Sequence, residues 1–189
     1  MNKSEETIYD KIEYRLFELI IQRVKLAKCI LDIGCGNCKL VNILAKQTTS
    51  KIIGVDIDDS GFANGISDAE VLGVSKRIKC IKVDAQFLTT VIDEQFEAVV
   101  SVYALHEYEK PEEVLQEAHR VLKPGGRIIV VDFLEGSTAQ RLWNEDYYTE
   151  GQIRNLLQKL GFRDIETVFP EGRELVLVEG MKKPIHGIR

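Results

Sequence analysis

An alternation of short apolar runs with helical stretches constrains the fold of this chain more than any other feature. Most of the apolar runs are continuous rather than interrupted by polar residues at every second position, as expected for strands buried on both faces of a parallel sheet. Helical patterns separate the first several runs, which is typical of an α/β protein. The runs are Cys29–Ile33, Lys51–Val55, Arg77–Val83, Ala98–Val102, Arg127–Val131, Arg163–Phe169 and Glu174–Val178.

The last two runs are joined only by a short connection around Pro170, Glu171 and Gly172. A crossover between parallel strands needs about a dozen residues, so these two strands must form an antiparallel hairpin. We therefore predict a three-layer α/β/α sandwich, with a mostly parallel seven-stranded sheet that ends in this hairpin. Ligands of such sheets bind at the carboxyl ends of the strands.

Three helices can be placed from their periodicity and their ends. Residues 5–27 carry apolar side chains near helical spacing. A second helix spans Pro111–Leu122, with Pro in its first turn, and stops at Lys123–Gly126 because Pro and Gly beyond a C-terminus end helices. A third begins with the capping-box sequence of residues 149–152 and ends at Gly161.

The bulk composition is that of an ordinary globular protein, 44% hydrophobic and 29% charged. We predict one domain over residues 1–189, with an N-terminal helix and possible lid at 1–27 and an α/β core at 28–180. No apolar run approaches the roughly 18 residues of a membrane span, and the charged N-terminus lacks a secretory apolar segment. Net charge is −5 and the Lys and Arg residues are scattered, which argues against nucleic-acid binding. We expect a cytoplasmic protein.

The first candidate site follows the first predicted strand, where Gly34-x-Gly36 leads into a helix. Glycines at this position permit a tight turn and let a ligand approach the backbone. Paired glycines alone are a weak signal. The third glycine of a dinucleotide fingerprint would fall at Lys39, so the motif does not favour a nicotinamide cofactor.

Two carboxylates end the next two strands. Asp56 lies twenty residues beyond Gly36 and can accept hydrogen bonds from both hydroxyls of a ribose. Asp84 ends the third strand and can accept from an adenine amino group. The alternative for each is an ordinary loop or cap aspartate, a role that Asp58 fits better than Asp56 does.

In this order the motifs resemble the class I S-adenosylmethionine-dependent methyltransferases, most of all the branch that acts on small molecules and includes the ubiquinone and menaquinone methyltransferases. The resemblance covers roughly residues 28–180. It implies a Rossmann-like fold, S-adenosylmethionine as the cofactor and methyl transfer to a small-molecule acceptor. The segments that carry it are Leu31–Gly36, Gly54–Asp56, Val83–Ala85, Phe96–Ser101 and Leu122–Gly126.

The resemblance also implies how the cofactor would be held at its amino-acid end. Gly34, Cys35 and Gly36 would pass under the amino-acid portion, with Asp32 near the ammonium group.

At the nucleoside end, the resemblance implies that Asp56 would hold the ribose and that Ile57 would pack on the adenine. Asp84 would accept from the adenine amino group, while Ala85 would offer a backbone amide.

Three residues at or just beyond the end of the fourth strand are expected on the acceptor side. By the resemblance, Ser101 and Tyr103 would line the methionine portion and the entrance to the acceptor pocket. His106 lies just beyond them and can act as a general base near neutral pH; the alternative is a polar residue that organises the loop.

Two sets of aromatic residues are candidates for enclosing the bound molecules. The segment Leu134–Tyr148 contains Trp143, Tyr147 and Tyr148, and we expect it to form the acceptor-pocket wall. Tyr9 and Tyr14 in the N-terminal helix either close over the cofactor or pack half-buried.

Cys35 and Cys38 form a Cys-x-x-Cys pair at a predicted helix start, where thiols can form a redox couple or half of a zinc site. No second pair of Cys or His at metal-ligand spacing matches them. We therefore expect no metal, and reduced thiols at all four cysteines. They are Cys29, Cys35, Cys38 and Cys80.

Two rival functions remain open from the sequence. A non-catalytic binding protein could retain the same cofactor pocket, and a nicotinamide-dependent oxidoreductase could use Gly34, Gly36 and Asp56. The chain lacks, after the fourth strand, the Asn/Asp-Pro-Pro-Tyr/Phe arrangement of methyltransferases that act on amides and exocyclic amines. This weakens nucleic-acid and glutamine acceptors.

Overall fold

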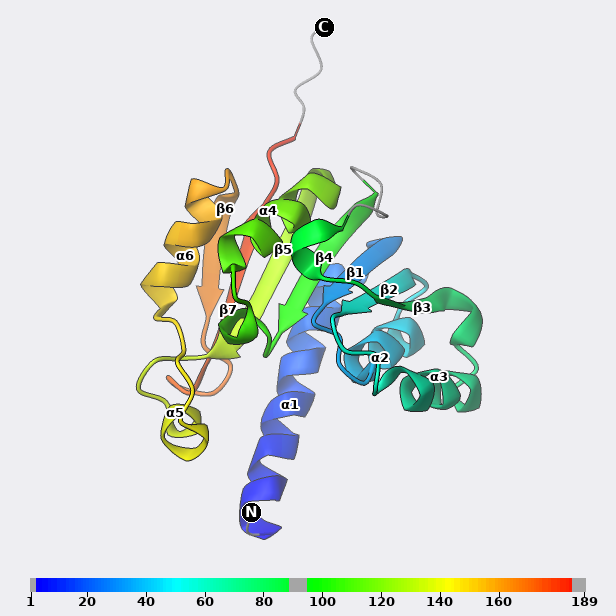
Figure 1. Ribbon diagram of the computed structural model, residues 1–189, viewed down its shortest axis with the longest axis horizontal. Coiled ribbons are helices and arrows are strands. Elements are labelled where there is room, and N and C mark those ends of the chain that lie inside the picture. Colours follow the sequence, from blue (N-terminus) through cyan, green and yellow to red (C-terminus); the bar gives the residue numbers. More distant parts are fainter. Residues whose placement is uncertain (1–2, 89–94, 185–189) are drawn as a thin grey trace, which may run out of the picture.

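A seven-stranded sheet forms the middle layer of the computed structural model, which describes residues 3–88 and 95–184 (Figure 1). The strand order is β3-β2-β1-β4-β5-β7-β6. β7 pairs antiparallel with β5 and β6, and the other neighbours are parallel. The predicted sheet with its terminal antiparallel hairpin is confirmed. The strands are β1 (Cys29–Ile33), β2 (Lys51–Asp56), β3 (Ile78–Lys82), β4 (Phe96–Val102), β5 (Leu122–Phe133), β6 (Arg163–Val168) and β7 (Leu175–Met181).

Helices cover both faces of the sheet. In Figure 1, α4 and α6 lie in front of it and α1 passes behind it. Short 3-10 turns follow the carboxyl ends of β3 and β4, and a third precedes β3. Among the described residues no helix is long and apolar enough to cross a membrane. The helices are α1 (Lys3–Val24), α2 (Lys39–Gln47), α3 (Phe62–Val71), α4 (Pro111–Val121), α5 (Thr138–Trp143) and α6 (Glu150–Lys159), with 3-10 turns η1 (Ser75–Arg77), η2 (Ala85–Phe87) and η3 (Leu105–Glu107).

The continuous apolar strands feed two separate cores. Successive strand residues point to opposite faces of a sheet. In β5, Ile128 and Val130 belong to the core under α4 and α6, while Ile129 and Val131 belong to the core under α1, α2 and α3. Both faces are therefore buried, which explains why the strand lacks the polar alternation of a half-exposed strand.

The ends of two elements differ from the prediction. α1 ends at Val24 rather than near residue 27. α4 ends at Val121, one residue before the predicted end at Leu122. β5 begins at once with Leu122 and includes Lys123–Gly126, which we had interpreted only as a helix stop. The pairing of β5 with β4 shifts register between Phe96 and Ala98, so this glycine-containing stretch is an irregular start of the strand.

Candidate functional site

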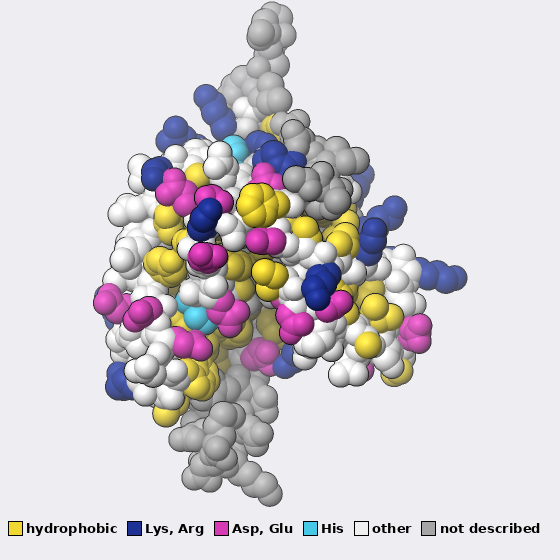
Figure 2. Space-filling view, viewed as in Figure 1, with side chains coloured by type: hydrophobic (Ala, Val, Ile, Leu, Met, Phe, Trp, Pro, Cys, Tyr) yellow, Lys and Arg dark blue, Asp and Glu magenta, His cyan; other side chains and the backbone are white. Residues whose placement is uncertain are grey.

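A cleft of about 400 Å³ lies at the carboxyl ends of β1, β2, β3 and β4. The chain leaves β1 toward β2 and β3 on one side and returns with β4 on the other, which makes this edge the topological switch point of the sheet. Acidic side chains border the central part of this face, and apolar side chains are visible between them (Figure 2). The cleft brings together several of the predicted residues: Gly34, Gly36, Asp56, Ile57, Asp84, Ala85 and Tyr103.

The turn after β1 is held tightly against the neighbouring strands. The amides of Gly34 and Cys35 both donate to the Val55 carbonyl, at 2.9 and 3.1 Å. Gly34 has φ +76°, and a Cβ placed on it would lie 2.5 Å from the Ala104 Cβ. Gly36 has φ +49°, and a Cβ there would meet nothing within 4 Å. The structure therefore needs Gly34 for backbone packing, whereas Gly36 leaves open space on the cleft side.

Asp56 at the end of β2 is bonded to this turn. Its Oδ2 accepts from the Gly36 amide at 2.7 Å, and its Oδ1 accepts from the Asp58 amide at 3.0 Å. Each carboxylate oxygen can accept a further hydrogen bond. Asp58 is exposed and accepts from the backbone and the side chain of Ser60, which hold its pKa below the ordinary value.

Asp32 is a buried acid beneath the cleft. Its side chain belongs to β1 and the residue is 2% exposed. No hydrogen bond reaches its carboxyl group from residues 3–88 and 95–184. Burial, and then the nearby charge of Asp56, raise the pKa of Asp32 to about 7. A charge here needs a partner that the described part of the chain does not supply.

The third predicted motif lies on the same cleft. Asp84 caps η2, with Oδ1 accepting from the Gln86 amide at 2.9 Å, and it lines the cleft beside Ala85. Ile57, directly after Asp56, lines the same cleft and is 68% exposed, so a large apolar side chain faces solvent at the cleft edge.

Ser101 lies behind the cleft rather than on it. The residue is 2% exposed, and its Oγ lies 2.8 Å from the Tyr108 hydroxyl. That hydroxyl also donates to the Ile33 carbonyl at 3.1 Å, directly before Gly34. Tyr108 lines the cleft, so Ser101 can influence a ligand in the cleft only through the Tyr108 side chain.

His106 is held by a buried carboxylate that sequence reasoning missed. Its Nδ1 lies 2.8 Å from Asp132 Oδ1, and its backbone amide donates to Asp132 Oδ2 at 3.0 Å. Asp132 is fully buried near the end of β5. Glu107, adjacent in η3, lines the cleft, and its Oε1 lies 4.0 Å from His106 Nε2. In the sequence Asp132 directly follows an apolar run, as Asp56 and Asp84 do, and this signal could have identified it.

A cluster of aromatic rings centred on Phe133 lies next to His106. Tyr103 stacks on Phe133 with ring centroids 5.0 Å apart, and Trp143 and Tyr147 pack edge-on against Phe133 at 5.2 and 5.6 Å. Tyr147 also lies against the His106 ring at 4.5 Å. Of the aromatic residues in the predicted acceptor wall, Trp143 and Tyr147 therefore meet on Phe133 and Tyr147 lies beside the histidine, whereas Tyr148 packs against the core under α4 and α6. The Tyr9 side chain lies outside the described part of the chain, and Tyr14 is 66% exposed.

The cysteines are not arranged as expected. Cys35 is buried and remains a free thiol, and burial together with the charges of Asp32 and Asp56 raises its pKa. Cys38, at the start of α2, is joined to Cys80 of β3 by a disulfide. The expectation of four reduced thiols is therefore wrong for this pair. In residues 3–88 and 95–184, no group of three or more His, Cys, Asp or Glu side chains could hold a metal ion.

The site fits a ligand that carries a ribose, an adenine and a charged amino group. The cleft volume is within the roughly 300–1,000 Å³ of small-molecule sites. Asp56 offers acceptors for two hydroxyls, and the unpartnered Asp32 carboxyl is suited to an ammonium group. The fold and this set of residues define an α/β protein of the S-adenosylmethionine-binding class.

Comparison with known proteins identifies the family. The family described as "Methyltransferase domain" matches residues 31–130, and the chain belongs to it. It is a class I S-adenosylmethionine-dependent methyltransferase, with S-adenosylmethionine as the cofactor, so the resemblance found in the sequence is confirmed.

Individual relatives have diverse names. The chain is 24% identical to a probable cobalt-precorrin-6B C(15)-methyltransferase (decarboxylating) of Saccharolobus solfataricus, over 97% of this chain and 83% of the relative. It is 27% identical to a ubiquinone/menaquinone biosynthesis C-methyltransferase of Citrobacter koseri, over 64% of this chain and only 48% of the relative. The structure of the [4+2]-cyclase SpnF has a TM-score of 0.79 at 21% identity, covering 90% of this chain and 81% of that one, which shows the shared fold.

Proposed function

We propose that this chain transfers a methyl group from S-adenosylmethionine to a small-molecule acceptor. The observation that carries the proposal is the convergence, at one cleft of a methyltransferase-family fold, of the glycine turn with the strand-end carboxylates Asp56 and Asp84. The names of the relatives support a small acceptor, since one is named for a cobalt-precorrin and another for ubiquinone/menaquinone biosynthesis. The scattered cations and the net charge of −5 support a protein that does not bind nucleic acid. We further propose that it acts in the cytoplasm without binding a membrane.

We infer the following arrangement at the amino-acid end of the cofactor. The turn of Gly34, Cys35 and Gly36 passes beneath it, and Asp32 pairs with its ammonium group. Ser101 supports this end through the Tyr108 hydroxyl rather than by direct contact.

At the nucleoside end, Asp56 accepts from the ribose hydroxyls and Asp84 accepts from the adenine amino group. Ile57 covers the adenine, which would bury a side chain that is otherwise 68% exposed, and Ala85 offers its amide. Tyr103 lies between the cofactor and the aromatic rings beside His106.

The chemistry then needs little from the chain beyond orientation and a base. When bound, S-adenosylmethionine supplies a methyl group on a positively charged sulfur. The cleft residues fix its direction and exclude water. His106 accepts the proton of an acceptor hydroxyl at Nε2, because Asp132 accepts from Nδ1 and thereby directs the free lone pair of the neutral ring to Nε2.

The acceptor side is the segment Leu134–Tyr148. Its Trp143 and Tyr147 rings, with Phe133 and Tyr103, favour an acceptor that is largely apolar or planar. The N-terminal helix contributes Ile12 to the same aromatic cluster, which supports a lid role for residues 1–27 over the α/β core of residues 28–180. Trp143 is 43% exposed and would be covered when an acceptor binds.

A screen of small-molecule acceptors with S-adenosylmethionine, read by product mass, tests the proposal. The expected result is the gain of one methyl group in at least one product. Cofactor binding without any methylated product would favour the alternative of a binding protein. Thermal unfolding distinguishes the cofactors: S-adenosylmethionine or adenosylhomocysteine at a hundredfold excess over Kd should stabilise the fold by about 2.7 kcal/mol, whereas NAD and NADP should not.

The role of His106 is tested on the same acceptor. His106→Ala should leave cofactor affinity almost unchanged and lower turnover by about 10²–10⁴-fold, with a smaller loss at high pH where the acceptor ionises by itself. Parallel pH–rate profiles for the two proteins would instead indicate that the ring only organises the loop.

A further inference from the structure

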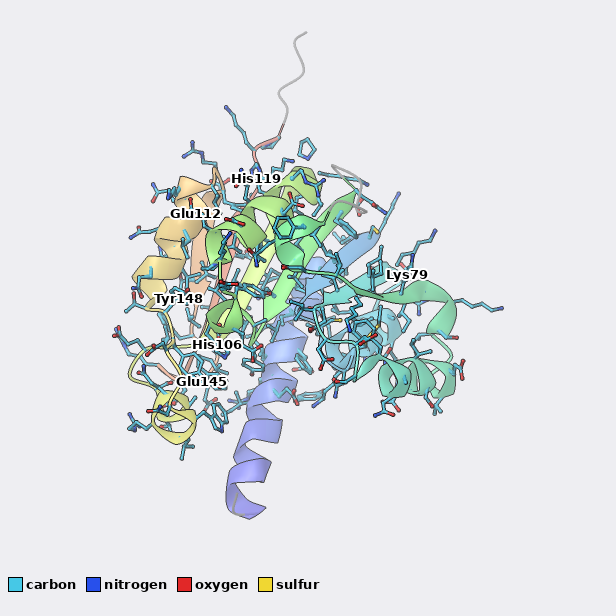
Figure 3. All side chains as sticks on the ribbon, in the orientation of Figure 1. Lys79, His106, Glu112, His119, Glu145 and Tyr148 are labelled. Atoms are coloured by element: carbon cyan, nitrogen blue, oxygen red, sulfur yellow. A yellow bond between two sulfur atoms is a disulfide. The ribbon has the colours of Figure 1, made fainter. Side chains whose placement is uncertain are left out.

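The His106 imidazole lies between two carboxylates, and Figure 3 shows His106 and Glu145 as neighbours beside α5. Nδ1 lies 2.8 Å from Asp132 Oδ1, and Nε2 lies 3.2 Å from Glu145 Oε2. Ionised carboxylates accept hydrogen bonds and cannot donate them. The contact with Asp132 is a hydrogen bond, and the contact with Glu145 is an ion pair that is attractive only while the ring is charged. Together the two contacts therefore favour the imidazolium form.

Glu145 is itself held at this position. The Tyr147 hydroxyl donates to the same Oε2 atom at 2.7 Å, and the Tyr147 ring lies against the imidazole. Both residues belong to the connection between α5 and α6, which follows the left-handed Asn144. This connection therefore brings a carboxylate and an aromatic ring to the Nε2 side of His106.

The groups that face the imidazole come from three elements. Asp132 belongs to β5, Glu107 belongs to η3, and Glu145 and Tyr147 belong to the α5–α6 connection. Burial lowers the pKa of His106, but the hydrogen bond and charge of Asp132, followed by the charges of Glu107 and Glu145, raise it above its ordinary value. While Glu145 stays at Nε2, the ring resists losing its proton and cannot serve as a base.

Methyl transfer from a sulfonium to a hydroxyl releases the proton of that hydroxyl. The His106 side chain is 7% exposed, so a proton accepted at Nε2 needs a route to solvent. The Glu145 side chain is 47% exposed and touches Nε2, so it connects the buried ring with bulk water.

We propose that Glu145 is a positioning and proton-relay residue, which occupies the place of the acceptor hydroxyl at His106 Nε2 in the resting protein and carries one proton from Nε2 to solvent in each turnover. The inference rests on the proposed function. The resting Nε2 proton leaves with Glu145 when the acceptor enters. The O–H bond of the acceptor then breaks as an N–H bond forms at Nε2. Glu145, which has meanwhile passed the earlier proton to water, returns as a carboxylate and pairs with the new N–H, and this restores the resting imidazolium.

NMR of the ring nitrogens of His106 tests the relay without any acceptor, in the full chain saturated with adenosylhomocysteine. Glu145→Gln should lower the pKa of His106, because a neutral amide stabilises the imidazolium less than a carboxylate does. It should also slow exchange of the Nε2 hydrogen with water at least roughly tenfold, because the general base for that exchange is gone. Glu135→Gln, an exposed change in the same part of the chain, is the matched control and should alter neither value.

Glu145→Ala gives a second test, because added formate should restore the exchange rate by entering the vacated space. An unchanged pKa of His106 in Glu145→Gln would overturn the pairing, and an unchanged exchange rate would overturn the relay. Failure of the proposed function has a different signature: the acceptor screen would then give no methylated product, whatever the NMR of the Glu145 variants shows.

Discussion

The amide of Gly36 donates a hydrogen bond of 2.7 Å to Asp56 Oδ2, which joins the glycine turn after β1 to the carboxylate that ends β2. Two motifs twenty residues apart in the sequence thus form one unit at the cleft. Asp56 shapes the turn through one oxygen while it keeps acceptor capacity for a ligand. Any substitution of Asp56 will therefore affect both the conformation of the glycine turn and the binding of a ligand.

Asp56→Ala should weaken S-adenosylmethionine binding by about 2 kcal/mol, because it removes a charged acceptor from two hydroxyls and releases the Gly36 amide. Asp58→Ala is the matched control, since Asp58 accepts from Ser60 on the surface, and it should have a much smaller effect. Isothermal titration calorimetry of both variants measures the difference. Equal losses would mean that the wrong carboxylate has been assigned to the ribose.

The two glycines of the turn should respond differently to alanine. Gly34→Ala should lower the free energy of unfolding by roughly 3 kcal/mol, since it forces a Cβ to within 2.5 Å of Ala104 Cβ and also strains a positive φ. Gly36→Ala should cost only about 1 kcal/mol, from φ alone, but should weaken cofactor binding because its Cβ enters the cleft. Urea unfolding and calorimetry separate the two effects. Comparable losses of stability would contradict this account.

The sequence was sufficient to predict those site residues whose pattern lies within one strand and the residue that follows it. Strand-end carboxylates such as Asp56 and Asp84 stand directly after apolar runs, and parallel strands bring their carboxyl ends to one edge. Asp132 has the same local signal but was not singled out. Its contact with His106 depends on β4 and β5 being neighbours, with Val102 opposite Val131, and that pairing joins residues far apart in the sequence.

Long-range packing decides the remaining contacts. Glu145 reaches His106 only because the α5–α6 connection returns over the end of β5, which no local pattern encodes. Cys38 meets Cys80 because α2 begins beside β3, so the Cys-x-x-Cys spacing pointed to the wrong partner. The cysteine nearest in the sequence, Cys35, is buried on its own.

Cofactor binding should release a proton through Asp32. The pKa of this acid is raised from 3.8 to about 7 in the folded chain, so between these values the folded state holds a proton that the unfolded state has lost. The stability of the free protein should therefore fall as pH rises from about 4 to about 7. Asp32→Asn should remove this slope in urea unfolding measured across the same range.

A cationic ligand favours the ionised form of Asp32, so S-adenosylmethionine binding near pH 6 should expel the proton. Calorimetry in buffers of different ionisation enthalpy measures the number of protons released on binding. Wild type should release a proton that Asp32→Asn does not, and equal release from both proteins would show that another group is titrating.

The hydroxyl of Tyr108 should stabilise the glycine turn from beneath. It donates to the Ile33 carbonyl at 3.1 Å and pairs with Ser101 Oγ at 2.8 Å. Tyr108→Phe keeps the ring but leaves two buried polar groups without this partner, so the free energy of unfolding should fall by about 1–2 kcal/mol. Tyr148→Phe is the control, because no hydrogen bond to the Tyr148 hydroxyl is present among the described residues.

A double-mutant cycle with Ser101→Ala sharpens this prediction. Both single changes break the same hydrogen bond, so the combined loss of stability should be smaller than the sum of the two single losses. Cofactor affinity should fall with Tyr108→Phe by more than with Ser101→Ala, since only the tyrosine hydroxyl reaches Ile33, the residue before Gly34. Additive losses in urea unfolding, or equal cofactor affinities in calorimetry, would show that the hydroxyl does not couple Ser101 to the turn.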